Sequence, residues 1–430
     1  MPRRLLFALL LASVSPVTGN LVRAKRSQGK SASRSPSMRL VAAHDNDGVA
    51  AGATVQLISQ YPWYHTSEDL RSEAMRLAAS CGGAVSVQTV NQSGVSVDVV
   101  KVRKPGTQPV NRVFMLFGEH SRELISPESG LHLLRVLCGD ARPREGAPSA
   151  DAVLRDSEFE MVLNGNPGSR PKVEGGDYCL RTNPRGIDLN RNWDEKFLRE
   201  PDPTGNVERG QTYGGPEAFS EPETQIFRRL VTEYEPTAFV SVHSGTRGMY
   251  MPWAFDTEHL AERNQPQMLE LLRTLDKTYC QCPFGAAGKE VGYSCAGTSL
   301  DWVYDKLQTP YAFAWEIYTS PAYARSLTTR WNAKAAAGAA LLEKGHHLGH
   351  PRFVDLFQTH ASDFVQVKHA LDHQHALDKM STDECFETFN PDTKELYDST
   401  VANWAAAYME MSQRIAGQLR GAQAANATAP

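Results

Sequence analysis

Four stretches of the chain are apolar at almost every position, and the sequence predicts each of them to be a buried strand. They are NRVFMLFG (111–118), EFEMVLNG (158–165), TAFVSVHSG (237–245) and PYAFAWEIY (310–318). Continuous apolar runs of this length are typical of strands that are covered on both faces of a sheet. Two further segments, VSVQTV (85–90) and VSVDVVKV (95–102), alternate in polarity and predict strands with one face more exposed.

Helical patterns separate these strands. Residues 66–80 repeat apolar positions along one face and can be capped by Thr66 or Ser67. Residues 126–139 begin with a capping serine followed by proline, and 220–234 begin with a capping box of Ser220 and Glu223. A strong apolar rhythm returns over 393–418. Strands that alternate with helices predict an α/β fold: one large domain around a mixed, mainly parallel twisted sheet with helices on both faces.

The two ends and one internal segment differ from this pattern. Residues 1–19 combine a basic start with a short apolar run and small residues, which predicts a signal peptide, although a cytosolic protein with an apolar start is the alternative. Residues 20–60 are basic and serine-rich; they predict a disordered lead-in or pro-segment, too short for a folded inhibitory domain, and Arg23–Arg26 has the spacing of a processing site. The expected organisation is then one main folded domain over 61–320, a His-rich helical insertion over 321–382, a C-terminal helix over 383–418 that completes the domain and a disordered tail over 419–430.

Composition narrows the class of protein. Of the 430 residues, 41% are hydrophobic and 22% charged, which is typical of a globular protein that can bury a sizeable core. The net charge of −4 does not indicate a nucleic-acid binder or a binder of anionic membranes, and no later stretch is apolar enough to span a bilayer. Seven cysteines in a secreted chain predict three disulfides and one free thiol, with a connectivity that the sequence does not determine. We expect a secreted monomer.

Candidate chemistry gathers at the ends of the predicted strands, where α/β sheets bind their ligands. His120 and Glu123 follow the first apolar run, His243 ends the third, and Glu316 interrupts the fourth. A His-x-x-Glu spacing also occurs at 65–68 and 259–262, but those copies lie in polar helix-like sequence and are better explained as solvated helix faces. Two histidines and a glutamate form a ligand set for catalytic zinc, in which a water completes the coordination.

Six segments together resemble the zinc metallocarboxypeptidase family of carboxypeptidase A/B and N/E relatives. They are GEHSREL (118–124), LRTNPRGIDLNRNW (180–193), YGGPEAFSEPET (213–224), Ser241–Gly245, GYSCAGTSLDWVY (292–304) and FAWEIY (313–318). GEHSRE is similar to the A/B group and GIDLNRN to the N/E group, so the chain resembles an outlying member between the two. The resemblance implies the fold of that family and one zinc ion per chain.

The resemblance also implies a role for each matching residue. His120, Glu123 and His243 would bind zinc, with Asp188 behind His120 as an orienting partner. Arg181 would stabilise negative charge on the carbonyl oxygen of the scissile bond, and Glu316 would be the general base and acid. For substrate binding, the implied residues are Asn190, Arg191 and Tyr293.

The physical requirements of an exopeptidase agree with these roles. A planar guanidinium recognises a free carboxylate through two parallel hydrogen bonds, and a separate arginine is needed where charge develops on the carbonyl. A solvated surface turn is the alternative explanation of Asn190 and Arg191 alone. A lone carboxylate such as Glu316 is costly in a buried strand unless a cation lies nearby, which a zinc site explains.

Specificity follows less directly. Leu300 and Ala254 occupy the two places where relatives specific for basic residues carry an acid, so an apolar or aromatic C-terminal residue is expected; Asp256, two residues from Ala254, is a charge that could reverse this. Gly245 replaces a substrate-side aromatic residue of digestive relatives.

Three alternatives remain open at this stage. The first is an inactive relative that binds peptides, and the second is another zinc hydrolase on the same fold. The third concerns the histidines of 321–382, which could form a second metal site, although a polar insertion without metal is the expected reading.

Overall fold

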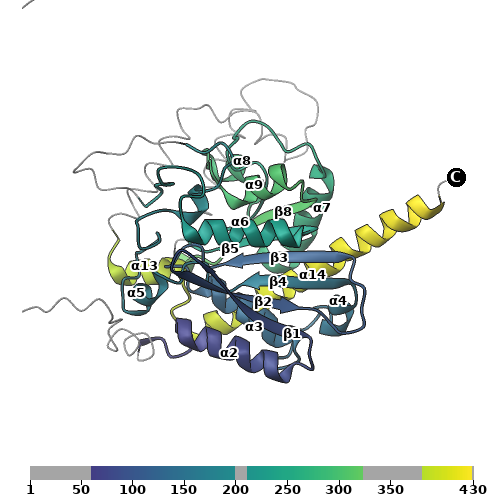
Figure 1. Ribbon diagram of the computed structural model, residues 1–430, viewed down its shortest axis with the longest axis horizontal. Coiled ribbons are helices and arrows are strands. Elements are labelled where there is room, and N and C mark those ends of the chain that lie inside the picture. The colour runs from purple at the N-terminus through teal and green to yellow at the C-terminus, as the bar shows by residue number, and fades with distance from the viewer. Residues whose placement is uncertain (1–59, 199–210, 323–379, 429–430) are drawn as a thin grey trace, which may run out of the picture. The chain divides into compact units, whose positions relative to one another are not determined.

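A computed structural model describes residues 60–198, 211–322 and 380–428 (Figure 1). All of them belong to one compact unit, Val49–Pro430. The predicted signal peptide, the basic lead-in up to residue 59 and the His-rich segment 323–379 lie outside the described residues, so these three predictions stay predictions.

An eight-stranded sheet forms the centre of the fold, in the order β1-β2-β4-β3-β5-β8-β6-β7. The strands are β1 (Val85–Gln92), β2 (Val95–Val102), β3 (Asn111–Phe117), β4 (Ser157–Val162), β5 (Ala238–His243), β6 (Arg247–Met251), β7 (Phe284–Ala286) and β8 (Tyr311–Ile317). The central strands β4, β3, β5 and β8 run parallel, whereas β2 and β6 pair with their inner neighbours in the antiparallel sense. The four near-continuous apolar runs are therefore the four central parallel strands.

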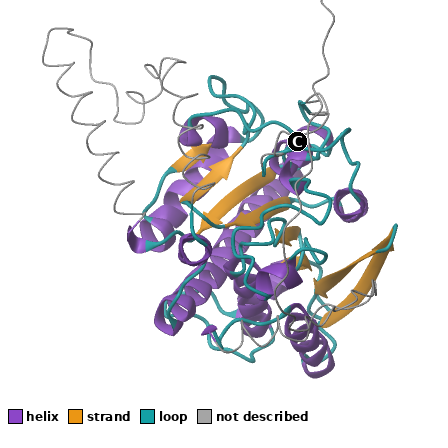
Figure 2. Cartoon of the chain, turned by 90° about the vertical axis from the view of Figure 1, so that its left-hand side faces the viewer, coloured by secondary structure: helices purple, strands orange, loops and turns teal. Residues whose placement is uncertain are grey.

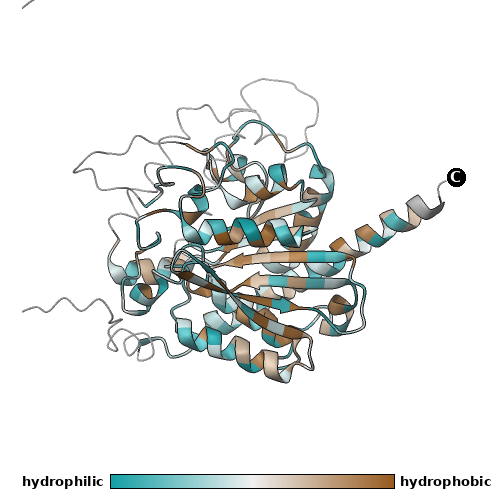
Figure 3. Cartoon of the chain, viewed as in Figure 1, coloured by the Kyte–Doolittle hydropathy of each residue, from teal (hydrophilic) through white to brown (hydrophobic). Residues whose placement is uncertain are grey.

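Helices cover both faces of this sheet (Figure 2). On β3, Met115 and Phe117 face a core shared with helices α2 (Ser67–Ser80), α3 (Ile125–Leu137), α7 (Gln265–Leu275) and α14 (Lys394–Thr428). The alternate residues Phe114 and Leu116 face a second core, formed with α6 (Pro222–Tyr234) and part of α9 (Ser299–Lys306). In Figure 3 hydrophobic residues run along the strands, while α2 and α6 carry both kinds of position. The predicted fold class is confirmed.

Two predicted helix starts are wrong in detail. The helix predicted from Ser126 begins at Ile125, and Ser126 instead accepts a hydrogen bond from the Gly118 amide and donates one to the carbonyl of Val242, at 3.2 and 2.6 Å. The capping box at Ser220 does not form, because α6 begins after Glu221 without a side-chain cap. In both cases the serine hydroxyl forms a hydrogen bond with a residue distant in sequence, Val242 or Asn192, instead of capping the helix.

The C-terminal region also differs from its prediction. In place of one helix over 383–418, there are two, α13 (Thr382–Phe389) and α14, and α14 continues to Thr428 through the part expected to be a disordered tail. Segments with weaker patterns, for which no element is predicted above, form β6, β7, α7, α9 and five short helices. These are α4 (Ala150–Asp156), α5 (Arg170–Glu174), η1 (Leu189–Arg191), η2 (Asp276–Cys280) and α8 (Ala287–Val291).

Candidate metal centre and active site

The ends of three neighbouring strands bring the candidate residues together. β5 lies between β3 and β8, and its last residue, His243, pairs in register with Glu316 of β8. Phe117 at the end of β3 pairs with Val242, so the turn that follows β3 carries His120 and Glu123 to the same edge. Parallel strands end at a common edge, which is why these segments, far apart in sequence, meet.

His120, Glu123 and His243 form a buried cluster whose potential ligand atoms lie within 4.8 Å of one another. The Nδ1 atoms of the two histidines are 3.1 Å apart, and the two carboxylate oxygens of Glu123 lie 2.7 Å from His120 Nδ1 and 3.1 Å from His243 Nδ1. Two imidazole nitrogens and a carboxylate that converge on one point are the donor set of a catalytic zinc site. The residues therefore fit a zinc ion.

The electrostatics of the cluster favour a cation. Burial works against the charged form of Glu123, but the two histidines lower its pKa far below the usual range. Burial also opposes a charge on His243, yet Glu123, Glu119 and Glu316 together raise its pKa to about 9. A site that binds a proton this readily offers the same negative potential to a metal ion.

Asp188 connects this cluster to Arg181. One oxygen of its carboxylate lies 3.1 Å from His120 Nε2, and the other accepts a hydrogen bond of 2.9 Å from Arg181 Nε and forms an ion pair with Nη2, also at 2.9 Å. Asp188 is fully buried, but Arg181 and His120 hold its pKa well below the usual range. An imidazole backed by a carboxylate in this way has a defined tautomer and orientation.

Asn190 and Arg191 lie in the short helix η1. Asn190 Oδ1 accepts from the backbone amide of Ser299 at 2.9 Å, and its Nδ2 lies 3.2 Å from His243 Nε2. The Arg191 guanidinium donates to the carbonyl of Asn190 at 2.8 Å. The backbone of Gly297 packs so closely on this turn that a Cβ at residue 297 would lie 2.4 Å from the carbonyl oxygen of Arg191.

Glu316 is partly exposed, and its Oε2 has no hydrogen-bond partner among the residues that the structure describes. Burial and the charge of Glu123 raise its pKa to about 7. A carboxylate with a free oxygen and a pKa near neutrality can take up and release a proton at physiological pH.

The expected substrate-side residues occupy neighbouring positions on α9 and the loop after β6. Leu300 is buried in α9, and the next residue, Asp301, accepts hydrogen bonds from the Ala254 amide at 2.9 Å, so the two expected pocket residues lie on joined segments. Tyr293 is 38% exposed. The carboxylate of Asp256 is occupied by its own loop, because it accepts from the amides of Glu258 and His259.

Sequence reasoning missed the contribution of α13. Phe389, at the end of this helix, lies where a side chain on residue 245 would be, since a Cβ on Gly245 would come within 2.3 Å of its ring. The same ring lies 4.0 Å from the guanidinium carbon of Arg122. The Phe389 ring therefore fills the space that a side chain on residue 245 would occupy. No local pattern in the sequence links Gly245 with Phe389, because the two residues lie far apart along the chain.

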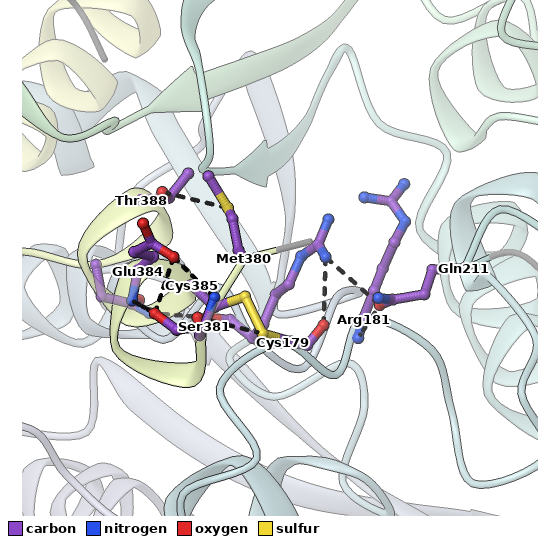
Figure 4. Close-up of a disulfide and its surroundings, with 10 residues drawn as sticks. Cys179, Arg181, Gln211, Met380, Ser381, Glu384, Cys385 and Thr388 are labelled. Carbon is purple, nitrogen blue, oxygen red and sulfur yellow. Dashed lines mark hydrogen bonds between the residues drawn. A yellow bond between two sulfur atoms is a disulfide. The ribbon is translucent and has the colours of Figure 1, made fainter. Parts of the chain in front are cut away.

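A disulfide anchors α13 to the loop that carries Arg181 (Figure 4). Cys179, two residues before Arg181, is bonded to Cys385, which lies 206 residues further along the chain. The other bridges are Cys81–Cys138 and Cys280–Cys282, and Cys295 is free. The predicted count of three bridges and one thiol is confirmed.

The fold and the cluster define an α/β protein with a buried zinc-type ligand set at the carboxyl edge of its sheet. Comparison with known proteins gives the family: the zinc carboxypeptidase model matches residues 70–330, and the chain belongs to that family. Zinc carboxypeptidase A 1 of Anopheles gambiae is 26% identical over 275 residues, 59% of this chain and 60% of that protein. Carboxypeptidase A2 of Mus musculus is 26% identical over 277 residues, 59% of this chain and 62% of its own. The chain thus spans about three-fifths of the length of these curated relatives.

Solved structures agree on the fold. Bovine thrombin-activatable fibrinolysis inhibitor, solved with a tick carboxypeptidase inhibitor, aligns with a TM-score of 0.57 at 16% identity over 83% of this chain and 99% of that one. Carboxypeptidase A from Helicoverpa armigera aligns with a TM-score of 0.50 at 15% identity, covering 73% of each chain. Among the residues that the structure describes, no helix is both long and apolar enough to cross a membrane.

Proposed function

We propose that this protein is a secreted zinc-dependent exopeptidase that removes the C-terminal residue from peptides. One observation carries the proposal: the His120, Glu123 and His243 cluster lies beside the free carboxylate oxygen of Glu316, on paired residues of neighbouring strands. The three disulfides are consistent with secretion. We expect a monomer that acts on peptide or protein C-termini and has no nucleic-acid partner.

Each residue has a role in the proposed reaction. A zinc ion held by the cluster would polarise the scissile carbonyl and acidify the attacking water. Glu316 accepts a proton from that water and passes it to the leaving amine, which its raised pKa of about 7 favours. Arg181, oriented by Asp188, donates to the carbonyl oxygen as negative charge develops there.

Recognition of the substrate terminus is assigned to Asn190, Arg191 and Tyr293. Arg191 offers guanidinium donors to a carboxylate, and Asn190 positions it through the carbonyl to which Arg191 donates. The exposed ring of Tyr293 is free to close over a bound terminus.

The specificity proposed is for an apolar or aromatic C-terminal residue. Leu300 and Ala254 add no charge, and the carboxylate of Asp256 is engaged by backbone amides of its own loop rather than left free for a basic side chain. Apolar contacts of this kind discriminate between side chains by about 1–3 kcal/mol, so the preference is graded.

The test uses the purified, zinc-loaded full chain and two versions of one peptide that ends in phenylalanine, with a free and with an amidated C-terminus. We expect loss of a single residue from the free acid, almost none from the amide, and loss of activity with a chelator. Equal cleavage of both peptides would point to a different zinc hydrolase, and zinc binding without cleavage to an inactive peptide-binding relative. A mixed peptide library then reports which C-terminal residues disappear.

A further inference from the structure

Glu119 is a buried carboxylate next to the cluster that the proposed reaction does not use. It lies two residues after the end of β3 and directly before His120, and its side chain is fully buried. Its Oε2 accepts from Ser241 Oγ at 2.6 Å and from Ser299 Oγ at 3.4 Å. Its Oε1 is buried, and the described part of the chain supplies it with no hydrogen-bond partner.

Such a carboxylate is costly for the fold. A buried ionised carboxylate needs a counter-charge or several strong hydrogen bonds. Within the described residues, the ion pairs of Glu119 include no lysine or arginine; its cationic neighbour is His243, whose Nε2 lies 3.5 Å from Oε2. The positive charge that offsets the burial cost of Glu119 therefore has to come from the metal cluster, to which His243 belongs.

The contacts form a chain from His243 to Glu119. The Nδ1 atom of His243 faces Glu123 and His120, so Nε2 carries the ring proton whenever Nδ1 binds a metal. That nitrogen lies 2.7 Å from Ser241 Oγ, which can accept its proton, and 3.2 Å from Asn190 Nδ2, an amide nitrogen that cannot. Ser241 Oγ in turn donates to Glu119. The hydrogen bonds thus run in one direction, from the His243 imidazole through the Ser241 hydroxyl to the Glu119 carboxylate.

We propose that Glu119 is a positioning residue of the metal centre, which acts through Ser241 to orient His243 and adds negative charge that favours a divalent cation. It does for His243 what Asp188 does for His120, but through a hydroxyl. Outer partners of metal ligands commonly contribute about 10- to 100-fold in metal affinity. This inference rests on the metal site of the proposed function and adds a residue to it.

The experiment measures the zinc affinity of the full chain by competition with a chromophoric chelator, for wild type, Glu119→Gln, Ser241→Ala and Ser299→Ala. We expect the first two variants to bind zinc about 10- to 100-fold more weakly. Ser299→Ala removes the longer contact to Glu119 and a 3.2 Å contact to Asn190 Oδ1, which keeps its hydrogen bond from the Ser299 amide; this variant is the matched control and should stay within about threefold of wild type. Glu119→Asp, which keeps the charge, should recover part of the loss.

A thermal-unfolding series separates positioning from a structural role. Zinc-free Glu119→Gln should unfold at or above the wild-type temperature, because a buried charge is removed, while added zinc should raise its midpoint less than it raises that of wild type. The absorption bands of the cobalt-substituted protein should shift in Ser241→Ala, which keeps the test available if Glu119→Gln fails to fold.

Two results overturn the inference. Zinc affinities of Glu119→Gln and Ser241→Ala within twofold of wild type would do so, as would a uniform loss of stability with and without zinc. A wild-type chain that binds no zinc would contradict the proposed function as well, whereas a wild type that binds zinc but cleaves no peptide contradicts only the proposed function.

Discussion

The candidate site has two halves that are held in different ways. His243 and Glu316 lie on paired residues of β5 and β8, so the hydrogen-bonded ladder of the sheet sets their separation. His120, Glu123 and Arg181 lie on loops, where no ladder acts. Their positions depend on a backbone hydrogen bond from the Ser121 amide to the Arg181 carbonyl, at 3.2 Å, on side-chain contacts and on one disulfide.

The tethers of the loop half come from distant parts of the chain. Asn390, just after α13, accepts from the amide of Ile125 and donates to the carbonyl of Arg122, at 3.0 and 2.9 Å. The Arg181 amide donates to the side chain of Gln211 at 2.9 Å, and Cys179 is bonded to Cys385. Strand geometry is robust because every residue of the strand contributes to it. The geometry of the loop half, in contrast, is sensitive to substitutions far from the reacting atoms.

Removal of the proton acceptor in the strand half should have the largest effect. Glu316→Gln keeps the size of the side chain but cannot accept a proton, so we expect kcat to fall by about 10²- to 10⁴-fold. Zinc content, measured by atomic absorption, should stay at the wild-type level because Glu316 lies outside the ligand cluster. Loss of zinc in this variant would mean that Glu316 is a ligand or a structural residue.

Cutting the covalent tether of the loop half should have the next largest effect. The double variant Cys179→Ser/Cys385→Ser should lower the free energy of unfolding by about 2–5 kcal/mol, as removal of native disulfides typically does. Below its melting temperature it should also lose kcat/KM, since the bridge lies two residues from Arg181.

The matched control for this variant is Cys81→Ser/Cys138→Ser, which opens a bridge that joins α2 to α3 at their C-terminal ends. We expect a loss of stability with kcat/KM nearly unchanged in the folded protein. Equal losses of kcat/KM in the two double variants would remove the distinction between the loop half and the rest of the fold.

A smaller effect is expected where the two halves touch, at Gly245. This residue has φ of +123°, a conformation that disfavours a side chain, and a Cβ there would overlap the ring of Phe389. Gly245→Ala should lower the free energy of unfolding by about 1–3 kcal/mol in denaturant titrations. Gly245→Ala/Phe389→Leu should recover the part due to overlap; if it recovers nothing, the backbone alone accounts for the cost.

The smallest effect concerns Glu290, a partly buried carboxyl outside both halves. Burial raises its pKa from 4.5 to about 7 in the folded protein. Between these two values Glu290 is protonated in the folded state but ionised in the unfolded state. The free energy of unfolding therefore falls as pH rises from about 4.5 to 7, and Glu290 causes no further change above about pH 7.

Glu290→Gln should therefore be more stable than wild type at pH 8, by about 1–2 kcal/mol, and match it near pH 4. Unfolding titrations at both values test this, with the exposed Glu145→Gln as the control that should show no such difference. A difference that is the same at both pH values would show that Glu290 does not titrate as described.

Which features could be predicted from the sequence depends on how far apart along the chain the interacting residues lie. The central strands were predicted because an apolar run needs no partner to be recognised, and the ends of such strands pointed to His243 and Glu316. The starts of α3 and α6 were wrong because Ser126 donates to the Val242 carbonyl and Ser220 accepts from the side chain of Asn192, in preference to capping a helix. β6 and β7 are short and contain glycine, so their local pattern is weak.

The sequence alone determined the α/β class, the central strands and, through six family-like segments, the residue types of the candidate site. Only the tertiary structure decided the partners: that Cys179 bonds Cys385, that Phe389 fills the place left by Gly245, and that Glu119 lies behind His243. The reason is physical. Apolar periodicity and motifs act over a few residues and are written along the chain, whereas the groups that hold a site meet across 100 or more residues and depend on how the whole fold closes.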